Sequence, residues 1–379
     1  MMQEKTINGI SIDTIESAIE DIRAGKVVIV VDDEDRENEG DFICAAEKIT
    51  PEIINFMATY GRGLICAPIT EQRAQELNLY PMVGNNTAMH ETAFTISVDL
   101  IGHGCSTGIS AYDRATGIRK LVDKSTAPEE FAKPGHIFPL KAKNGGVLRR
   151  TGHTEAAIDL ARLAGFNPAG VLVEILNEDG TMARLPELSK IAEKHDLKLI
   201  TIKDLVSYRL LKEKLVVKKY GQTIDSPFGA LNFSVYNQLT TNDEHLVISK
   251  GNWSTEEDVL VRVQSHSDWK DGIFDQIFQD NPLEIQRALS QISEEGKGLL
   301  LIMRHKEKDK DPVSLIHQFA GDDKVEAKEM QNQRDFGIGA QILLDMGVRK
   351  MKLLTEHPRK RIALDGYGLE ITEFIPLAQ

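Results

Sequence analysis

The sequence predicts two layered, mixed-sheet domains of α/β to α+β architecture, and three observations support this prediction. In the first 210 residues, short apolar runs typical of buried strands alternate with segments of helical periodicity. The second half opens on strand-like runs and only then alternates helix and strand. Between the halves, a basic stretch and then a polar one with Gly and Pro interrupt both patterns. We therefore expect one domain over residues 1–210, a linker over 211–222 and a second domain over 223–379.

Length, composition and charge exclude several classes of protein. The 379 residues are 41% hydrophobic and 27% charged, as is usual for a folded chain of two to three domains. No apolar run approaches the roughly 18 residues of a membrane-spanning helix, and the N-terminus lacks the apolar core of a secretory signal. The net charge of −13 argues against non-specific binding to nucleic acid or to an anionic membrane. Three widely spaced cysteines form neither a disulfide framework nor a C-x-x-C metal pair, so we expect a cytoplasmic protein.

The elements follow in order from apolar spacing and from caps. Four isoleucines recur at helical spacing between residues 12 and 22, and Gly25 ends that helix. Thr50 and Thr70 cap the starts of two further helices. In the first half we also expect strands at 27–31, 63–67, 93–98, 169–176 and 198–202, and helices at 153–163, 186–195 and 203–214. In the second half we expect strands at 230–235, 245–249, 259–263, 298–303, 350–355 and 369–375, and helices at 282–292 and 336–346.

The run from Asp32 to Asp41 has seven carboxylates in ten residues. Most acidic runs are solvated loops. This one begins where a buried strand ends, which is where open α/β sheets place their ligand sites, and Gly40 permits a turn back at its end. Clustered carboxylates attract a hard divalent cation and exchange protons with carbon acids. The run therefore predicts an active-site loop.

Residues 145–155 predict a phosphate site at the start of a helix. Thr151 and Gly152 lead into the helix, whose first backbone N–H groups can bind a phosphate together with Arg150. His153 falls in the first turn. A lone histidine is more often structural, but together with an acidic loop it becomes a candidate for a mixed Glu/His metal site.

Two other residues stand out by their position. His136 lies between a Pro-Gly turn and a strand, where a fixed backbone presents the side chain. Glu174 interrupts an apolar strand. It is either an outward-facing residue of an edge strand, or an acid or base whose proton affinity is raised by burial.

Five motifs resemble those of 3,4-dihydroxy-2-butanone 4-phosphate synthases. They are DDEDRENEGD at 32–41, GISAYDR at 108–114, PGHIFPL at 134–140, GGVLRRTGHTEA at 145–156 and NEDGTMAR at 177–184. The resemblance extends over residues 10–209 with the motifs in order. It implies the synthase fold and a lyase of riboflavin biosynthesis, which converts ribulose 5-phosphate to a four-carbon phosphate and formate. It also implies Mg²⁺ or Mn²⁺ as cofactor, and a homodimer with active sites near the subunit interface.

The resemblance implies a role for each matching residue. Glu37 and His153 resemble the ligands of the divalent metal. The expected catalytic residues are His136, Glu174, Asp113 and Cys66. The residues expected to contact the substrate are Arg36, Glu37, Asp41, Arg150, Thr151, Gly152, His153, Thr154 and Glu174.

Residues 215–379 resemble GTP cyclohydrolase II, most strongly after Arg334. Arg334, Thr355 and Lys360 match nucleotide-binding positions of that family. The family holds a catalytic zinc with three cysteines, whereas this chain has no cysteine after Cys105. Ser267 stands near the first ligand position, and a charged stretch at 306–311 replaces the Gly-rich loop. We therefore expect no zinc and no cyclohydrolase activity.

Two alternatives remain open for the second domain. His266, Asp268 and Asp271 could in principle hold a metal without thiolates, which would make the chain a bifunctional enzyme that also hydrolyses GTP. A domain without hydrolytic activity could instead bind GTP as a regulatory module.

Overall fold

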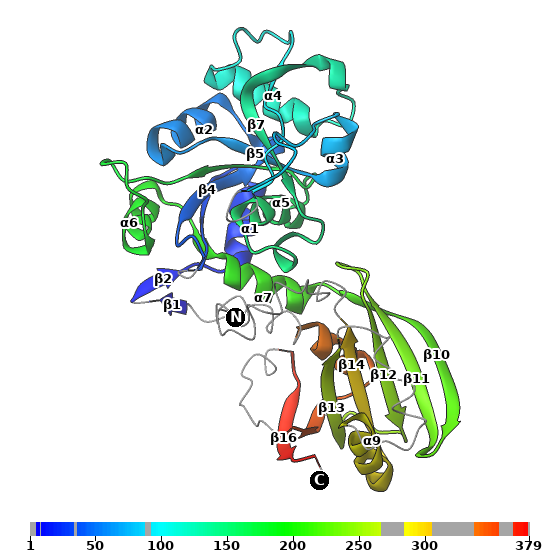
Figure 1. The fold of residues 1–379 in the computed structure, drawn as a ribbon. Helices are drawn as coiled ribbons and strands as arrows, with labels where there is room; N and C mark the ends of the chain where they lie inside the picture. The colour runs from blue at the N-terminus through cyan, green and yellow to red at the C-terminus, as the bar shows by residue number, and fades with distance from the viewer. Residues whose placement is uncertain are drawn as a thin grey trace. The chain divides into compact units, whose positions relative to one another are not determined.

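The computed structural model describes residues 5–7, 9–33, 36–87, 92–266, 284–304, 337–355 and 367–377. They fall into two compact units, Met1–Arg209 and Leu210–Gln379. Each unit is built on one mixed β-sheet covered by helices (Figure 1). The predicted fold class, two layered mixed-sheet domains of α/β to α+β type, is confirmed.

The sheet of the first unit has the strand order β6-β7-β5-β8-β4-β3-β9 among the described residues. The strands are β3 (Val28–Val31), β4 (Gly40–Ala45), β5 (Cys66–Thr70), β6 (Val98–Leu100), β7 (Phe131–Ala142), β8 (Gly170–Glu174) and β9 (Leu199–Thr201). The pairs β3–β9 and β5–β7 are parallel, and the other pairs are antiparallel. A short hairpin of β1 (Lys5–Ile7) and β2 (Ile10–Ile12) precedes the sheet in the chain.

Helices cover both faces of this sheet. One face packs against α1 (Ile15–Arg23) and α5 (His153–Leu163), and the other against α2 (Pro51–Phe56), α4 (Ala111–Val122) and α6 (Leu185–His195). Two further helices are α3 (Glu71–Glu76) and α7 (Ile202–Lys212). Because both faces are covered, β3 and β4 are buried at every position, which explains the near-continuous apolar runs in their sequences.

Both predicted threonine caps are present, while some strand boundaries differ from prediction. The hydroxyls of Thr50 and Thr70 accept hydrogen bonds from the third residue of their helices. The strand expected at 63–67 begins only at Cys66, because the backbone N–H of Leu64 donates to the Glu174 carboxylate rather than to a neighbouring strand. The strand expected at 93–98 is β6, Val98–Leu100, and the residues before it form only isolated bridges.

The sheet of the second unit has the order β10-β11-β12-β14-β13-β15-β16 among the described residues. The strands are β10 (Val216–Ser226), β11 (Gly229–Gln238), β12 (Glu244–Lys250), β13 (Asp258–His266), β14 (Gly298–Arg304), β15 (Lys350–Leu354) and β16 (Glu370–Ile375). The ladder is antiparallel from β10 to β14 and parallel from β14 through β13 and β15 to β16. Residues 211–222, expected as a linker, thus hold the end of α7 and the first part of β10.

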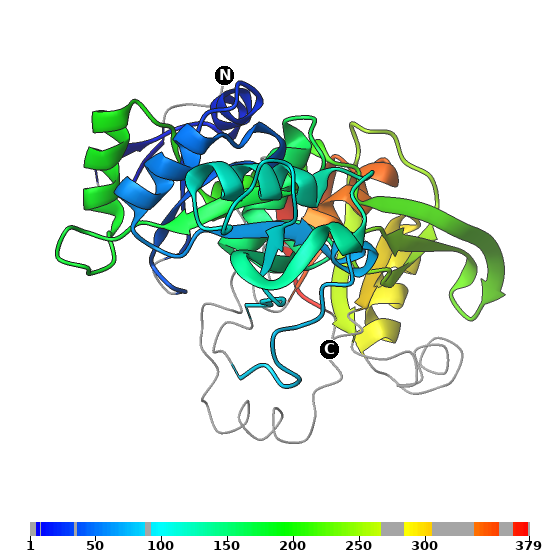
Figure 2. The ribbon, with the colours of Figure 1, turned by 90° about the horizontal axis from the view of Figure 1, so that it is seen from above.

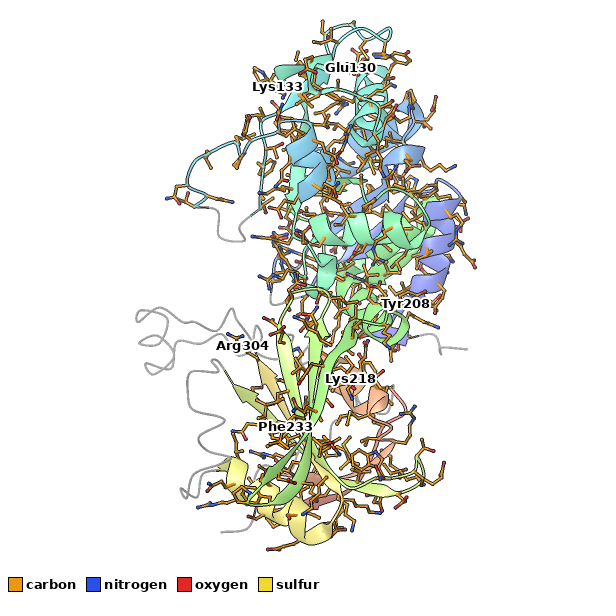
Figure 3. All side chains as sticks on the ribbon, turned by 90° about the vertical axis from the view of Figure 1, so that its right-hand side faces the viewer. Glu130, Lys133, Tyr208, Lys218, Phe233 and Arg304 are labelled. Carbon is orange, nitrogen blue, oxygen red and sulfur yellow. The ribbon has the colours of Figure 1, made fainter. Side chains whose placement is uncertain are left out.

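One face of this second sheet carries a hydrophobic core under α9 (Glu284–Glu295), which Figure 2 shows in yellow. Phe233, labelled in Figure 3, enters that core from β11. A helix over 337–345 also contributes buried apolar residues to this unit. No helix in the described parts of the chain is both long and apolar enough to cross a membrane.

Candidate active site

Most of the residues predicted from the acidic loop and from the 145–155 segment meet in one pocket of the first unit, which Thr151 and Gly152 do not line. Its volume is about 150 Å³. The end of β8, the start of β4, the start of β5 and the N-terminus of α5 all contribute to its walls. The lining residues are Arg36, Glu37, Glu39, Asp41, Cys66, Thr92, Phe94, Leu140, Arg150, His153, Thr154, Leu172 and Glu174.

Asp32 holds the part of the acidic loop from Arg36 to Glu39 in place. Its Oδ1 accepts a hydrogen bond from the backbone N–H of Glu39 (2.8 Å), and its Oδ2 accepts from that of Glu37 (3.2 Å). The same Oδ2 lies 2.8 Å from Nη1 of Arg36, which also contacts Oε2 of Glu37 at 2.6 Å. From outside the loop, Arg184 donates to the carbonyl oxygen of Glu37 at 2.8 Å. The loop therefore presents Glu37 to the pocket from a backbone that side chains hold in place.

His153 presents one nitrogen to the carboxylates of the pocket. Its Nε2 lies 3.1 Å from the carbonyl oxygen of Val30, which can only accept, so Nε2 carries the hydrogen and Nδ1 keeps its lone pair. Nδ1 lies 3.9 Å from Oε2 of Glu37 and 3.8 Å from Oδ1 of Asp41. Burial lowers the pKa of His153, so its imidazole is neutral at neutral pH.

Asp41 is a buried carboxylate with an unused acceptor. It is 2% exposed, and its Oδ1 has no hydrogen-bond partner within the described residues. Burial, together with the nearby charges of Glu174 and Glu37, raises its pKa well above the usual range. A divalent cation would satisfy this atom, because it offers a positive charge where the protein offers no donor.

The geometry of these groups fits one magnesium ion. Mg²⁺ binds its ligands at about 2.1 Å, so two ligands of one ion lie at most about 4.2 Å apart. The distances from Nδ1 of His153 to Glu37 and to Asp41, 3.9 and 3.8 Å, fall within that limit. Asp32 lies in the same cluster, but both of its oxygens already accept hydrogen bonds from the loop. We therefore count it as a support of the loop.

Two guanidinium groups meet the N-terminus of α5. A Cβ atom added to Gly152 would lie 2.4 Å from Nη1 of Arg150 and 3.2 Å from Nη2 of Arg36, so a larger residue there would displace the ends of these side chains. Nη1 of Arg150 is also held at 2.7 Å by Oε2 of Glu155, a carboxylate that is 1% exposed. The other oxygen of Glu155 accepts from the backbone N–H of Lys143 at 3.0 Å. Positive charge and helix N–H groups together make this corner suitable for a phosphate.

Glu174 and Cys66 form the floor of the pocket. Because β8 lies between β5 and β4, the alternative of an outward-facing residue on an edge strand is wrong for Glu174. Its Oε2 accepts the backbone N–H of Leu64 at 3.0 Å. Burial first, and then the charges of Glu174 and Asp41, raise the pKa of Cys66, so this residue is a thiol rather than a thiolate at neutral pH.

His136 and Asp113 do not line this pocket. Nδ1 of His136 lies 2.7 Å from Oδ2 of Asp99, and the imidazole side chain is 45% exposed. Asp113 accepts hydrogen bonds from the Ser106 hydroxyl at 2.9 Å and from the Gly108 N–H at 3.0 Å. Three large apolar side chains that precede Asp113 in the sequence, Ile101, Ile109 and Tyr112, are about half exposed.

Sequence reasoning missed several residues that support the site, among them Glu155, Arg184 and Thr92. Glu155 belongs to the quoted GHTEA motif, but its contact with Arg150 depends on the tertiary structure. In the second unit, Thr355 directly follows β15, and its N–H donates to the carbonyl of Ile375 at 2.9 Å. Arg334 and Lys360, together with Ser267, Asp268 and Asp271 of the metal question, lie outside the described residues.

Comparisons with known proteins agree with both resemblances. A family model for 3,4-dihydroxy-2-butanone 4-phosphate synthase matches residues 16–208, and one for GTP cyclohydrolase II matches residues 218–376. The riboflavin biosynthesis protein RibBA of Cytophaga hutchinsonii is 55% identical, with 97% of this chain and 93% of that protein covered. RibBA of Aquifex aeolicus is 50% identical, with 96% and 92% covered.

Solved structures give the same result. A crystal structure of RibBX, a two-domain 3,4-dihydroxy-2-butanone 4-phosphate synthase from A. baumannii, has 39% identity and a TM-score of 0.77, covering 97% of this chain and 100% of that one. A 3,4-dihydroxy-2-butanone 4-phosphate synthase in complex with two magnesium ions has 42% identity and a TM-score of 0.50, covering 52% of this chain and 96% of that one. The chain therefore belongs to the 3,4-dihydroxy-2-butanone 4-phosphate synthase family and carries a GTP cyclohydrolase II domain after its synthase domain.

Proposed function

We propose that the first domain, residues 1–210, converts D-ribulose 5-phosphate to L-3,4-dihydroxybutan-2-one 4-phosphate and formate in the riboflavin pathway of the cytoplasm. The observation that carries the proposal is the pocket in which Glu37, Asp41 and His153 face one another beside the Arg150 corner. A sugar phosphate can use both the metal ligands and the Arg150 corner. Its phosphate binds positive charge, and its hydroxyl and carbonyl oxygens are ligands for a hard cation.

Glu37 and His153 would hold Mg²⁺ or Mn²⁺, with Asp41 close enough to contribute its free oxygen. The ion would polarise the sugar carbonyl and stabilise the negative charge of an enediolate. Asp41 would also serve as a substrate contact, because burial raises its pKa and thereby favours proton exchange with the sugar carbons.

The remaining site residues would bind and orient the substrate. Arg36, Arg150 and Thr154, which line the pocket, would contact the phosphate end at the α5 N-terminus. Thr151 and Gly152, which lead into α5 and do not line the pocket, would add their backbone N–H groups. Glu174, fixed by the Leu64 N–H, acts as an acid or base toward the carbon skeleton. Cys66 lines the site as a neutral thiol.

We also propose a homodimer in which His136 and Asp113 act at the subunit interface. In the single chain these two residues stand apart from the pocket. The half-exposed side chains of Ile101, Ile109 and Tyr112 supply the apolar surface that a subunit interface needs. A second subunit is thus how these residues would reach a substrate.

For the second domain, residues 223–379 after a connection at 211–222, we propose that cyclohydrolase activity has been lost and that no zinc is bound. The argument is the absence of any cysteine after Cys105. The comparisons do not support this loss, because the RibBA relatives match both domains, so it stays a prediction. A bifunctional enzyme that also hydrolyses GTP, and a regulatory module that binds GTP, are the alternatives.

One assay tests both domains, since each reaction releases formate. We expect the full chain with Mg²⁺ to release formate from ribulose 5-phosphate and not from GTP. Glu37→Gln and His153→Ala should abolish the release from ribulose 5-phosphate. Glu178→Gln, which alters a carboxylate that is 94% exposed, is the matched control and should behave as the unaltered chain does. Full activity in either pocket variant would refute the metal assignment, and formate from GTP would refute the loss of the second activity.

A further inference from the structure

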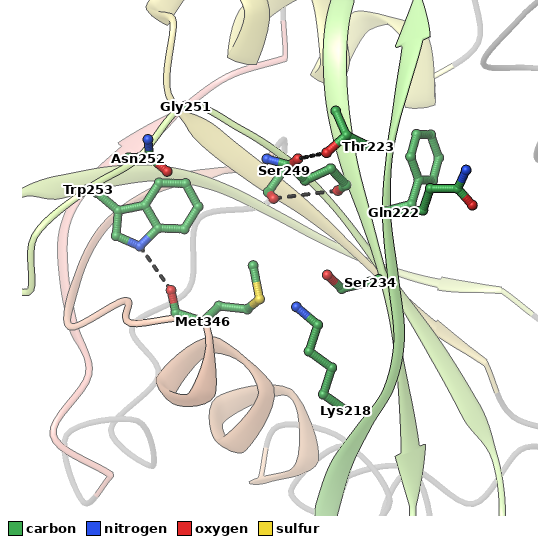
Figure 4. Close-up of a pocket in the computed structure, with 12 residues that line it drawn as sticks. Lys218, Gln222, Thr223, Ser234, Ser249, Gly251, Asn252, Trp253 and Met346 are labelled. Carbon is green, nitrogen blue, oxygen red and sulfur yellow. Dashed lines mark hydrogen bonds between the residues drawn. The ribbon is translucent and has the colours of Figure 1, made fainter.

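The second unit contains a pocket of about 660 Å³ that neither domain's proposed chemistry uses (Figure 4). This volume is within the range of small-molecule sites. It lies on the face of β10, β11 and β12 that points away from the α9 core. The lining residues are Lys218, Gly221, Gln222, Thr223, Asn232, Phe233, Ser234, Ser249, Gly251, Asn252, Trp253 and Met346.

The pocket is separated across the sheet from Thr355, the described position matched to nucleotide binding. Ser234 on β11 pairs with Val247 on β12, which pairs with Leu301 on β14. Strand β13 and then β15, which Thr355 follows, come next in the sheet. Four strand spacings of about 4.8 Å separate the two positions by about 19 Å across the sheet. The part of the pocket formed by Lys218 and Ser234 is therefore separate from Thr355.

Two polar groups face this pocket without a partner. Ser234 is 3% exposed, and its hydroxyl makes no hydrogen bond to any described residue. Figure 4 shows this hydroxyl directed into the pocket, with the amine of Lys218 reaching in from the neighbouring strand. The stem of Lys218 lies against Gly221, where an added Cβ would come within 3.2 Å of Cε. A hydroxyl that opens onto the pocket and has no protein partner is available to hydrogen-bond a ligand.

Other polar groups of the wall already have partners. The Thr223 hydroxyl donates to the side-chain oxygen of Asn232 at 2.6 Å, and the indole N–H of Trp253 donates to the carbonyl of Met346 at 3.1 Å. The second bond leaves the flat ring of Trp253 as an ordered side wall (Figure 4). The pocket wall thus combines the hydrogen-bonded pair Thr223 and Asn232 with the aromatic ring of Trp253.

The charge of the pocket favours an anion. Lys218 is a cation and no lining residue is a carboxylate, although the whole chain has a net charge of −13. Asp345, next to Met346, accepts from the Tyr236 hydroxyl at 2.8 Å and lies 3.4 Å from the amine of Lys214. The partners of the Asp345 carboxylate are therefore residues that do not line the pocket, and Asp345 does not neutralise the charge of Lys218.

We propose that this pocket binds a small organic phosphate. The phosphate lies between Lys218 and Ser234, and the organic part lies along Trp253 and the row of Thr223 and Asn232. A lysine amine and a free hydroxyl are donors that match phosphate oxygens, and an aromatic ring packs against a sugar or a base. The assignment is independent of the chemistry proposed for the first domain.

The test uses Trp253 as a local reporter in the full chain. The sequence has two tryptophans, so Trp269→Phe leaves Trp253 as the sole emitter. Inorganic phosphate, ribose 5-phosphate and guanosine 5′-monophosphate are titrated separately. We expect saturable changes in emission, with at least one ester binding more tightly than inorganic phosphate. Tighter binding of the nucleotide would assign the Trp253 wall to a base, and tighter binding of the pentose ester would assign it to a sugar.

The variants separate this pocket from binding elsewhere. Lys218→Met should weaken the ester about tenfold or more, because it removes a charge-assisted hydrogen bond. Lys219→Met is the matched control, since Lys219 is the next residue but pairs with Glu244 at 2.7 Å outside the lining. Ser234→Ala should weaken binding without lowering the melting temperature, because its hydroxyl has no partner to lose.

Three results would overturn the proposal. They are an unchanged Trp253 emission with every probe, equal titrations for Lys218→Met and Lys219→Met, and equal affinity for inorganic phosphate and both esters. If Trp269→Phe fails to fold, broadening of the ³¹P resonance of ribose 5-phosphate is compared between the two lysine variants of the otherwise unaltered chain. A difference between those variants supports the site, and equal broadening overturns it.

Discussion

Replacing Arg209 by methionine should destabilise the first unit through a buried ion pair. Nη1 of Arg209 lies 2.8 Å from Oδ2 of Asp159, and the two side chains are 5% and 4% exposed. The same Nη1 donates to the carbonyl of Gly145 at 2.7 Å, and Asp159 accepts the backbone N–H of Val147 at 2.8 Å. The pair thus holds the segment that leads to Arg150, so its loss affects both stability and the active site.

The size of the effect follows from what remains around Asp159. Breaking a buried pair by removing one partner costs about 3–5 kcal/mol. Arg162 stays 3.6 Å from Oδ1 of Asp159, so we expect the lower end of that range. For a unit of this size, about 3 kcal/mol lowers the melting temperature by roughly 6–12 °C.

The loss should depend on pH in a defined direction. Burial raises the pKa of Asp159, and the charge of Arg209 opposes that rise. Without Arg209 the folded-state pKa lies further above its unfolded value, so the variant loses stability as pH rises through and beyond the unfolded pKa. Arg209→Met should therefore be more destabilised, relative to the unaltered chain, at pH 7 than at pH 5.

Differential scanning calorimetry of the full chain checks these values. Arg162→Met is the matched control, because that arginine is 40% exposed and its removal should cost less than about 1 kcal/mol. Adding Asp159→Asn to Arg209→Met removes the uncompensated charge and should recover part of the loss. The reasoning is refuted if the two arginine variants melt alike at pH 7, or if the double variant is no more stable than Arg209→Met.

Three other expectations concern the active site. Glu155→Gln replaces the ion pair with Arg150 by a weaker bond from the guanidinium to a neutral amide oxygen, so the KM for ribulose 5-phosphate should rise about 5- to 30-fold with kcat nearly unchanged. Steady-state formate release measures both constants, and a fall in kcat alone contradicts the prediction. Iodoacetamide at neutral pH should leave Cys66 unmodified by mass spectrometry, because burial raises the pKa of its thiol; rapid alkylation at this residue would show that the pocket stabilises a thiolate. His136→Gln should lower kcat about a hundredfold or more without changing the melting temperature, since its contact with Asp99 lies at the surface; near-normal turnover would remove His136 from the reaction.

The acidic loop and the α5 start could be predicted because their signals are local. A carboxylate run after a buried strand and a Thr-Gly helix start each occupy a few consecutive residues. The sequence alone therefore identifies Glu37, Arg150 and His153 as candidate site residues. The pairing of Glu155 with Arg150 depends on where a folded helix turns its first residues, which no local pattern encodes.

The linker prediction shows the same limit for the fold. Strand β10 occupies part of 211–222, yet nearly all of its side chains are exposed because it is an edge strand. A strand that is exposed to solvent on both faces has no alternation of polar and apolar residues, so its sequence pattern predicts a loop. Only its partner β11, which follows in the chain, gives it a place in the sheet.

The fixed oxygen of Glu174 has a consequence for how substitutions at this residue are interpreted. One carboxylate oxygen must accept the Leu64 N–H, so the other oxygen is the one left to face the pocket. In Glu174→Gln the amide oxygen must take the place opposite Leu64, because an NH₂ group there would meet another donor. The NH₂ group is then turned toward the substrate. The amide therefore does not copy the carboxylate at this position: it offers the reacting molecule a donor where the carboxylate offers an acceptor.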